Sequence, residues 1–341
     1  MKAGIIGISG YTGLELIRLI QQHPHLEVGT VYSSSMNKKT FQAQFPHLQQ
    51  PIAPLNLTTF NAQQLMKDND LLFFATPSGI SKDLVAPFVE NNFPVIDLSG
   101  DLRLKNPELY QKWYQKAPAK IDILRKFEYC LPEWHAPTGN FIANPGCFAT
   151  AASLALMPLV KDQLIEFSSI VIDAKSGLSG AGKKLADTSH FVNVAENMSM
   201  YKVNQHQHIP EIIQFMQKYE KEFNTLQFTT SLIPIKRGIF LSLYAKVAQE
   251  TNENALYESY LKAYQKQPFV RIQKELPQIR QVLTSNFCDI GLRYNPQTHM
   301  VTVVSVIDNL VKGAAGQAIQ NFNLWADLES NCGLEQIPIF P

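Results

Sequence analysis

Residues 2–16 read KAGIIGISGYTGLEL, and this stretch decides the fold of the first part of the chain. Its apolar run at 3–8 predicts a β-strand, and the run at 14–22 predicts a helix. The glycines between them follow G-x-x-G-x-x-G spacing, one residue off the standard dinucleotide fingerprint. Although glycine is common in any strand-to-helix turn, here it lets backbone N–H groups approach a pyrophosphate at a helix N-terminus. The sequence therefore predicts a dinucleotide site at Gly7, Ser9, Gly10, Tyr11, Thr12 and Gly13.

Strands and helices alternate along the chain outward from this stretch. The runs at 26–32, 70–76 and 94–98 predict strands, and residues 81–91 predict a helix. The run at 70–76 is continuously apolar, which is typical of a strand buried on both faces of a parallel sheet. This βαβ rhythm predicts an α/β, doubly wound Rossmann-type domain.

The second half of the chain has a different texture. Its β-branched and aromatic runs at 169–174, 227–234, 240–248 and 300–306 alternate with long loops and amphipathic helices at 210–223 and 253–266. This predicts an α+β domain with a mainly antiparallel sheet. The closing run at 311–328 predicts a helix that packs on the first domain, and its small residues at 313–316 permit a close approach to a cofactor or another backbone. We predict a dinucleotide-binding domain of residues 1–146 plus 311–341 and a catalytic and oligomerisation domain of residues 147–310.

Composition excludes several classes of protein. The 341 residues are 45% hydrophobic and 17% charged, as in ordinary globular proteins. A net charge of +1 gives no nucleic-acid footprint, and no apolar stretch reaches membrane-spanning length. Four widely spaced cysteines without a C-x-x-C pair argue against a disulfide framework or a metal cluster, so we expect no metal and a cytoplasmic protein.

Cys147 is the strongest candidate for chemistry. It follows Asn144-Pro145-Gly146, where a turn gives way to a helix-prone apolar run. A cysteine in the first turn of a helix experiences the positive end of the macrodipole, which favours the reactive thiolate. The alternative is a small buried hydrophobe, the usual fate of a free cysteine.

The end of the second predicted strand bears on the cofactor. NAD-binding versions of the fold usually place an acidic residue there, to hold the ribose 2′-hydroxyl. This chain has Ser33, Ser34 and Ser35, followed by Lys38 and Lys39. Hydroxyl and ammonium groups can bind a 2′-phosphate as hydrogen-bond donors, so we predict NADP rather than NAD, with contacts from Ser33 and Ser35.

Longer motifs resemble one family. They are residues 9–16 (SGYTGLEL), 97–104 (DLSGDLRL), 144–147 (NPGC), 173–182 (DAKSGLSGAG), 206–212 (HQHIPEI), 285–289 (SNFCD) and 308–318 (DNLVKGAAGQA). Together they resemble aldehyde dehydrogenases that act on acyl phosphates, and within these the N-acetyl-γ-glutamyl-phosphate reductases of arginine biosynthesis. The chain departs from the family pattern at Ser34, where relatives often have arginine, at Ser78 and at Gln207.

The resemblance implies roles for individual residues. Cys147 is the expected nucleophile, His208 the acid/base with His206 second, and Glu211 an orienting carboxylate. Expected cofactor contacts beyond the first loop are Pro77, Ser179, Gly180 and Asn309, and expected substrate contacts are Arg103, Asn144, Ser176, Gly177 and Arg237. Without the resemblance, these residues also fit flexible turns, helix caps and solvated surface charges.

The resemblance also implies a reaction and partners. We expect NADPH-dependent reduction of a small-molecule acyl phosphate through a cysteine thioester, in a homodimer or homotetramer that binds neither nucleic acid nor membrane. Two alternatives share the fold and the thiol: a reductase of aspartyl phosphate and one of carrier-bound aminoadipyl phosphate. A third is a dinucleotide-sensing protein without catalysis.

Overall fold

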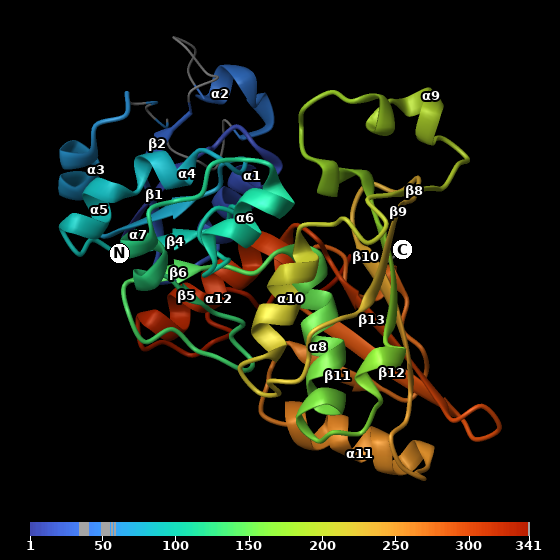
Figure 1. Cartoon of the computed structure of the whole chain (residues 1–341). Helices are drawn as coiled ribbons and strands as arrows, with labels where there is room; N and C mark the ends of the chain where they lie inside the picture. Colours follow the sequence, from blue (N-terminus) through green and yellow to red (C-terminus); the bar gives the residue numbers. More distant parts are fainter. Residues whose placement is uncertain (34–40, 49–54, 56, 58, 340–341) are drawn as a thin grey trace. The chain divides into compact units, whose positions relative to one another are not determined.

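The computed structural model describes residues 1–33, 41–48, 55, 57 and 59–339 of the chain (Figure 1). The chain divides into two compact units. Unit 1 comprises Met1–Pro145 with Ala314–Leu334, and unit 2 comprises Gly146–Gly313 with Glu335–Pro341. The predicted domain boundaries lie one residue from the end of the first segment of unit 1, at Pro145, and three residues from the start of its second segment, at Ala314. The prediction also places the residues after Leu334 in the first domain, whereas they belong to unit 2.

The described residues of unit 1 build a six-stranded sheet in which every pairing is parallel. The order is β2-β1-β3-β4-β6-β5, with β1 at Lys2–Ile6, β2 at Glu27–Tyr32, β3 at Leu71–Phe74, β4 at Val95–Asp97, β5 at Glu128–Tyr129 and β6 at Phe141–Ala143. All residues of β3 are buried, as its apolar run predicted. The chain leaves β1 on one side for β2 and continues on the other side with β3, so the winding reverses between β1 and β3. The predicted doubly wound domain is confirmed.

Helices of unit 1 follow the strands in the predicted alternation. Their bounds are α1 Tyr11–Ile20, α2 Phe41–Gln44, α3 Ala62–Asp68, α4 Ser81–Leu84, α5 Ala86–Glu90, α6 Pro107–Tyr114, α7 Ile121–Lys126 and α12 Gly316–Trp325. The C-terminal helix α12 packs next to α1: the Phe322 ring lies 5.6 Å from the His23 ring, and Asn323 Oδ1 lies 2.8 Å from His23 Nε2. The predicted return of the closing helix to the first unit is therefore confirmed.

Two predicted helices are interrupted. The run at 81–91 breaks at Val85 into α4 and α5. Pro87 lies in the first turn of α5, where its missing N–H costs nothing, but inside one continuous helix it would leave the Asp83 carbonyl without a donor. The run at 311–328 opens with a π-helical turn at Val311–Ala315 before α12.

The described residues of unit 2 build a seven-stranded sheet in the order β11-β12-β13-β10-β7-β9-β8. The strands are β7 Val171–Ser176, β8 Ser199–Tyr201, β9 Gln227–Leu232, β10 Ile239–Lys246, β11 Val270–Gln273, β12 Cys288–Asn295 and β13 Met300–Ile307. Only the β11–β12 and β7–β9 pairings are parallel within this described sheet, so the predicted mainly antiparallel sheet is confirmed. The helices are α8 Cys147–Lys161, α9 Phe191–Val194, α10 His208–Met216 and α11 Glu253–Tyr264.

Helix α8 is the apolar centre of unit 2. Every residue from Phe148 to Val160 is buried. Pro158 inside this helix cannot donate to the Leu154 carbonyl, and the Tyr264 hydroxyl of α11 donates to that oxygen instead, at 2.6 Å. Long-range contacts of this kind hold α8, and with it the position of its first residue, Cys147.

Candidate active site

Cys147 is the first residue of α8. The preceding Gly146 is the N-cap, with extended backbone (φ −76°, ψ 158°), and within the described chain no side chain caps this end. The Gly146 N–H donates to Glu211 Oε1 at 2.7 Å, which pins the turn to α10. The Cys147 side chain is half-buried, so a substrate can reach it. Because Cys147 is the first residue of α8, it also experiences the positive end of the helix dipole.

The two predicted histidines lie together beside this helix. Their ring centroids are 4.6 Å apart, and Phe148 packs edge-on against both, 5.2 Å from His206 and 6.1 Å from His208. The backbone N–H of His208 donates to His206 Nδ1 at 3.2 Å, so that nitrogen is an acceptor. Phe148 directly follows Cys147 in the chain, so the histidine pair packs against the first turn of α8.

His206 and His208 are both buried. Burial is the main cause that lowers the pKa of His206 well below its usual value, and the neighbouring His208 and Lys202 lower it further. These effects favour the neutral form of the His206 ring. His208 begins α10, and its ring packs against Phe148 and the His206 ring.

Tyr201 is a residue of this site that the sequence analysis missed. Its ring lies 6.0 Å from the His206 ring. Burial raises the pKa of Tyr201, and the negative charge of a Cys147 thiolate raises it further, so the phenol stays protonated beside the thiol. No motif marks this tyrosine in the sequence; a short edge strand, β8, delivers it.

Glu211 is fully buried. Its carboxylate accepts a hydrogen bond from the Gly146 N–H, whereas the expected partner was a histidine. The carboxylate accepts the N–H of the residue before Cys147, so it holds the nucleophile's turn through the backbone. The predicted role of Glu211 in orienting a histidine stays a prediction.

The small-residue loop after β7 lies against Asn309. Asn309 Nδ2 donates to Ser179 Oγ at 3.0 Å, and its Oδ1 accepts the Gly238 N–H at 2.7 Å. Arg237 pairs through Nε with Asp308 Oδ2 at 3.3 Å, and its backbone lies so close to Gly177 that a Cβ there would be 2.9 Å from the Arg237 nitrogen. Of the predicted residues, Ser179, Asn309, Gly177 and Arg237 are thus brought together in unit 2, next to Ser176 and Gly180.

Gly313 packs directly on Cys147. A Cβ at this position would lie 2.7 Å from Cys147 Cβ and 3.1 Å from Cys147 Cα. The small residues at 313–316 were expected to allow a close approach to a cofactor or another backbone, and in the structure Gly313 approaches Cys147.

We expect Gly313→Ala to lower turnover by about 10- to 100-fold, because an added methyl group must displace the nucleophile and a misplacement of about 1 Å costs up to 10²-fold. The measurement is kcat together with the rate of Cys147 alkylation, and thermal unfolding separates this effect from lost stability. Wild-type turnover in the variant would show that Cys147 tolerates the displacement.

The predicted dinucleotide loop lies at the carboxyl ends of β1, β2 and β3, where the winding of unit 1 reverses. The Gly7 N–H donates to the Tyr32 carbonyl at 2.9 Å, and Ser9 Oγ lies 3.0 Å from Ser33 Oγ. Open parallel sheets bind ligands at this type of position. The structure thus brings the predicted residues Gly7, Ser9, Gly10 and Ser33 together; Pro77 follows β3, and Ser34, Ser35, Lys38 and Lys39 lie outside the described residues.

Gly7 and Gly13 of this loop have no room for side chains. Gly7 has φ +95°, and a Cβ on it would lie 2.5 Å from the Ala75 carbonyl oxygen; a Cβ on Gly13 would lie 2.7 Å from the Gly7 oxygen. Gly10 is the N-cap of α1, and in the described structure no side chain caps that helix end. The backbone N–H groups at the start of α1 therefore present a bare, positively polarised end, which fits a pyrophosphate.

Arg103 lies in a buried polar network after β4. Its Nε donates to the Asn144 carbonyl at 2.8 Å and its Nη2 to the Leu98 carbonyl at 2.7 Å. Burial, followed by the charge of Asp101, raises the pKa of Asp97 to about 7. Arg103 thus supports the backbone of the predicted substrate residue Asn144, and direct contact of either residue with substrate stays a prediction.

Two family models match the chain. Residues 2–139 match the one described as semialdehyde dehydrogenase, NAD binding domain, and residues 147–309 the one described as semialdehyde dehydrogenase, dimerisation domain. The chain is 50% identical over 337 residues to the N-acetyl-gamma-glutamyl-phosphate reductase of Lactococcus lactis, covering 99% of each chain. It is 49% identical over 341 residues to that of Streptococcus gordonii, covering 100% of each.

Solved structures of lower identity share the fold. Aspartate semialdehyde dehydrogenase II of Vibrio cholerae has a TM-score of 0.70 at 17% identity, covering 96% of this chain and 98% of that one. The Candida albicans aspartate semialdehyde dehydrogenase, solved with NADP, has a TM-score of 0.65 at 16% identity, covering 95% and 98%. Separately, none of the helices among the described residues combines the length and apolar character needed to cross a membrane.

Proposed function

This chain belongs to the semialdehyde dehydrogenase family and within it to the N-acetyl-γ-glutamyl-phosphate reductases, and we propose that it reduces N-acetyl-γ-glutamyl phosphate to N-acetylglutamate 5-semialdehyde with NADPH, releasing phosphate. The observation that carries this proposal is Cys147 at the bare N-terminus of α8, with the histidine pair packed against the next residue. An acyl phosphate is an activated electrophile, and a thiolate near neutral pH is the nucleophile that suits it.

In the first step, the Cys147 sulfur attacks the acyl carbon. The C–S bond forms, the bond from carbon to the phosphate oxygen breaks, and phosphate leaves with the electron pair of that bond. The product on the protein is a thioester. The helix dipole at Cys147 favours the attacking thiolate. We propose that the protonated Tyr201 phenol, whose pKa the Cys147 charge raises, donates a hydrogen bond to the developing negative charge.

The residues of unit 1 fit a dinucleotide, because the first loop leaves no room for side chains at Gly7 and Gly13 and offers the uncapped start of α1. When bound, NADPH supplies the hydride that reduces the thioester carbon. His208 would give a proton to the substrate oxygen as the hydride arrives, which leaves a thiohemiacetal on Cys147, and would take that proton back as the C–S bond breaks, so that the aldehyde leaves and Cys147 returns as thiolate. Near-neutral titration makes a histidine suited to this transfer.

The remaining predicted residues are proposed as anchors. Ser179 and Gly180 with Asn309 serve the cofactor, and Arg103, Asn144, Ser176, Gly177 and Arg237 serve the substrate anion. The internal bonds of Asn309 and Arg103 support a role in which they hold the binding loops in shape. We propose residues 1–146 with 311–341 as the dinucleotide-binding domain and residues 147–310 as the catalytic and oligomerisation domain.

Oligomerisation is supported by apolar side chains on the surface of unit 2. Leu185, Phe191 and Met200 are 94%, 77% and 60% exposed, and all lie within the stretch that matches a dimerisation domain. We propose a homodimer or homotetramer, to be tested by analytical ultracentrifugation. None of the four cysteines, all of which are described, forms a disulfide, which supports a reducing, cytoplasmic setting.

The substrate assignment is tested by running the reaction backwards, as phosphate-dependent reduction of NADP⁺. N-acetylglutamate, aspartate and aminoadipate semialdehydes are compared in parallel under the same conditions. The proposal expects the first to give the largest kcat/KM. A larger kcat/KM for either of the other two semialdehydes would identify a different substrate for the same reaction type. NADPH binding without turnover of any of the three would identify a dinucleotide-sensing protein.

For the cofactor we expect NADPH to be preferred over NADH at least several-fold in kcat/KM. The physical reason is the Ser33–Ser35 run with Lys38 nearby and no carboxylate to repel a 2′-phosphate. Steady-state kinetics with both cofactors measures the ratio. Equal efficiency would mean that the serine at position 34, where relatives often have arginine, has removed the discrimination.

A further inference from the structure

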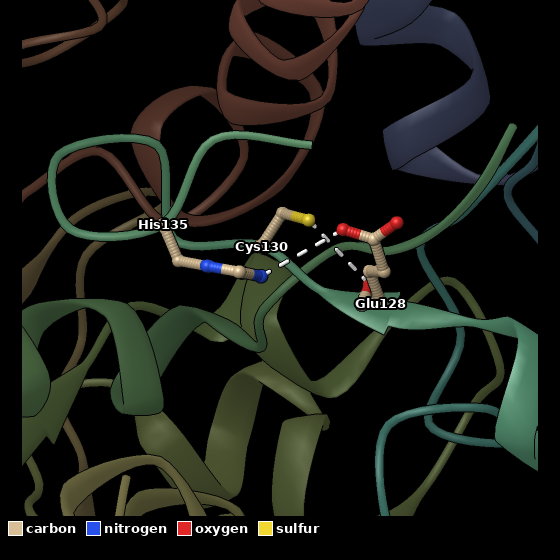
Figure 2. A group of neighbouring side chains, drawn as sticks. All are labelled: Glu128, Cys130 and His135. Carbon is tan, nitrogen blue, oxygen red and sulfur yellow. Dashed lines mark hydrogen bonds and ion pairs between the residues drawn. The ribbon is translucent and has the colours of Figure 1, made fainter. Parts of the chain in front are cut away.

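Three side chains with metal-binding atoms converge in unit 1 where the edge strand β5 ends. Glu128, Cys130 and His135 each offer one ligand atom, and these atoms all lie within 4.8 Å of one another. Figure 2 shows the Cys130 thiol and the His135 ring both directed toward the Glu128 carboxylate. We propose that these three residues bind a thiophilic divalent cation of the zinc class, a site separate from the reduction chemistry.

The local fold explains why these residues meet. Their spacing is E-x-C-x4-H, and a tight turn lies between the cysteine and the histidine. The N–H groups of Trp134 and His135 both donate to the Leu131 carbonyl, at 2.9 and 2.8 Å, which turns the chain back toward β5. The sequence has no C-x-x-C pair, and for that reason no metal was expected. A missing C-x-x-C pair does not exclude a site built from one carboxylate, one thiol and one imidazole.

The donor set suits zinc or cobalt better than calcium or magnesium. Thiolate, imidazole and carboxylate are the usual ligands of Zn²⁺, whereas the alkaline-earth ions take oxygen ligands. Thiolate and carboxylate together supply two negative charges, which balance a divalent cation. Three protein ligands leave a fourth tetrahedral position for water.

Only small movements bring the three atoms to bonding distance. Zinc bonds of about 2.0–2.3 Å in a tetrahedral site place ligand atoms roughly 3.5 Å apart, so the cluster must contract by about 1 Å. The buried Cys130 provides a rigid anchor. The side chains of Glu128 and His135 are 25% and 36% exposed and have space to rotate.

The present contacts show what a cation would replace. Cys130 Sγ lies 3.6 Å from the Glu128 carbonyl oxygen as a thiol donor, and His135 Nε2 lies 3.7 Å from Glu128 Oε2. Thr138 donates its N–H and hydroxyl to the same carboxylate, at 3.1 and 2.9 Å, and a cation would compete with these two bonds. Binding converts the Cys130 thiol to a metal thiolate and releases one proton to the buffer, with no change of oxidation state.

The test is titration of the full-length protein with Co²⁺, in a Cys147→Ala background that removes the other reactive thiol. We expect one equivalent to bind, with a near-ultraviolet thiolate-to-cobalt charge-transfer band and the intense visible bands of tetrahedral cobalt. Zn²⁺ should displace the cobalt and abolish both signals. Calorimetry of Zn²⁺ binding in buffers of different ionisation enthalpy should report the released proton. Absence of the charge-transfer band would overturn the proposal.

Ligand variants and matched controls locate the site. Cys130→Ser should eliminate the charge-transfer band, and His135→Gln should weaken binding at least as much as the loss of an outer-shell partner does, about 10- to 100-fold. Cys332→Ser and His25→Gln, which change residues of unit 1 that are not members of the cluster, should bind as the parent does. His135 is partly exposed, so its variant remains informative if Cys130→Ser does not fold. An unchanged band in Cys130→Ser or an unchanged affinity in His135→Gln would refute the site.

Discussion

Cys147→Ser is expected to abolish turnover while NADPH affinity stays nearly intact. An alkoxide forms far less readily at neutral pH than a thiolate, and the dipole at the start of α8 cannot close that gap in acidity. Loss of a covalent nucleophile typically costs about 10⁴- to 10⁶-fold in kcat. NADPH binding should persist, because the glycine loop that fits the pyrophosphate belongs to unit 1.

Single-turnover kinetics and cofactor titration of the same preparation separate the two effects. Cys332→Ser is the matched control and should keep wild-type turnover. In the wild type, iodoacetamide should modify Cys147 first, and substrate should protect it, as seen by mass spectrometry. Substantial activity in Cys147→Ser would exclude this residue as the nucleophile.

The second large effect is expected when the side chain proposed to transfer the proton is replaced. His208→Asn should lower kcat by about 10²- to 10⁴-fold, the usual contribution of general acid–base catalysis. Cys147 should remain alkylatable in this variant, but more slowly, because the imidazole helps to favour the thiolate. The pH–rate limb near neutrality should disappear.

His206→Asn is the comparison that distinguishes the two rings. Burial and its neighbours hold the pKa of His206 well below the ordinary histidine value, so this ring is already neutral where the limb is measured. Its Nδ1 accepts the His208 N–H, which is a positioning contact. We therefore expect a smaller loss of turnover and a preserved limb. The reverse result, with the limb lost in His206→Asn, would move the acid/base role to His206; if neither variant changes the rate, the proton comes from another group.

Local sequence was sufficient where the physical cause is local. The β1–loop–α1 unit was predictable because a strand, a glycine turn and a helix follow one another within about fifteen residues. Cys147 at a helix start was predictable for the same reason. The broken helix at Val85 has a local cause too, in Pro87, which the periodicity of apolar residues does not register.

What surrounds Cys147, by contrast, was decided by the tertiary structure. Glu211 accepts the Gly146 N–H across 65 residues, Gly313 packs on Cys147 across 166, and Tyr201 comes from a short edge strand without a motif. The Glu128–Cys130–His135 cluster is close in sequence, yet it exists only because the turn at Leu131 closes on β5. Such contacts depend on which surfaces pack together, and neither residue spacing nor periodicity contains that information. The sequence determined the candidate nucleophile, the winding of the first sheet and the family, whereas packing determined which groups hold and tune that candidate.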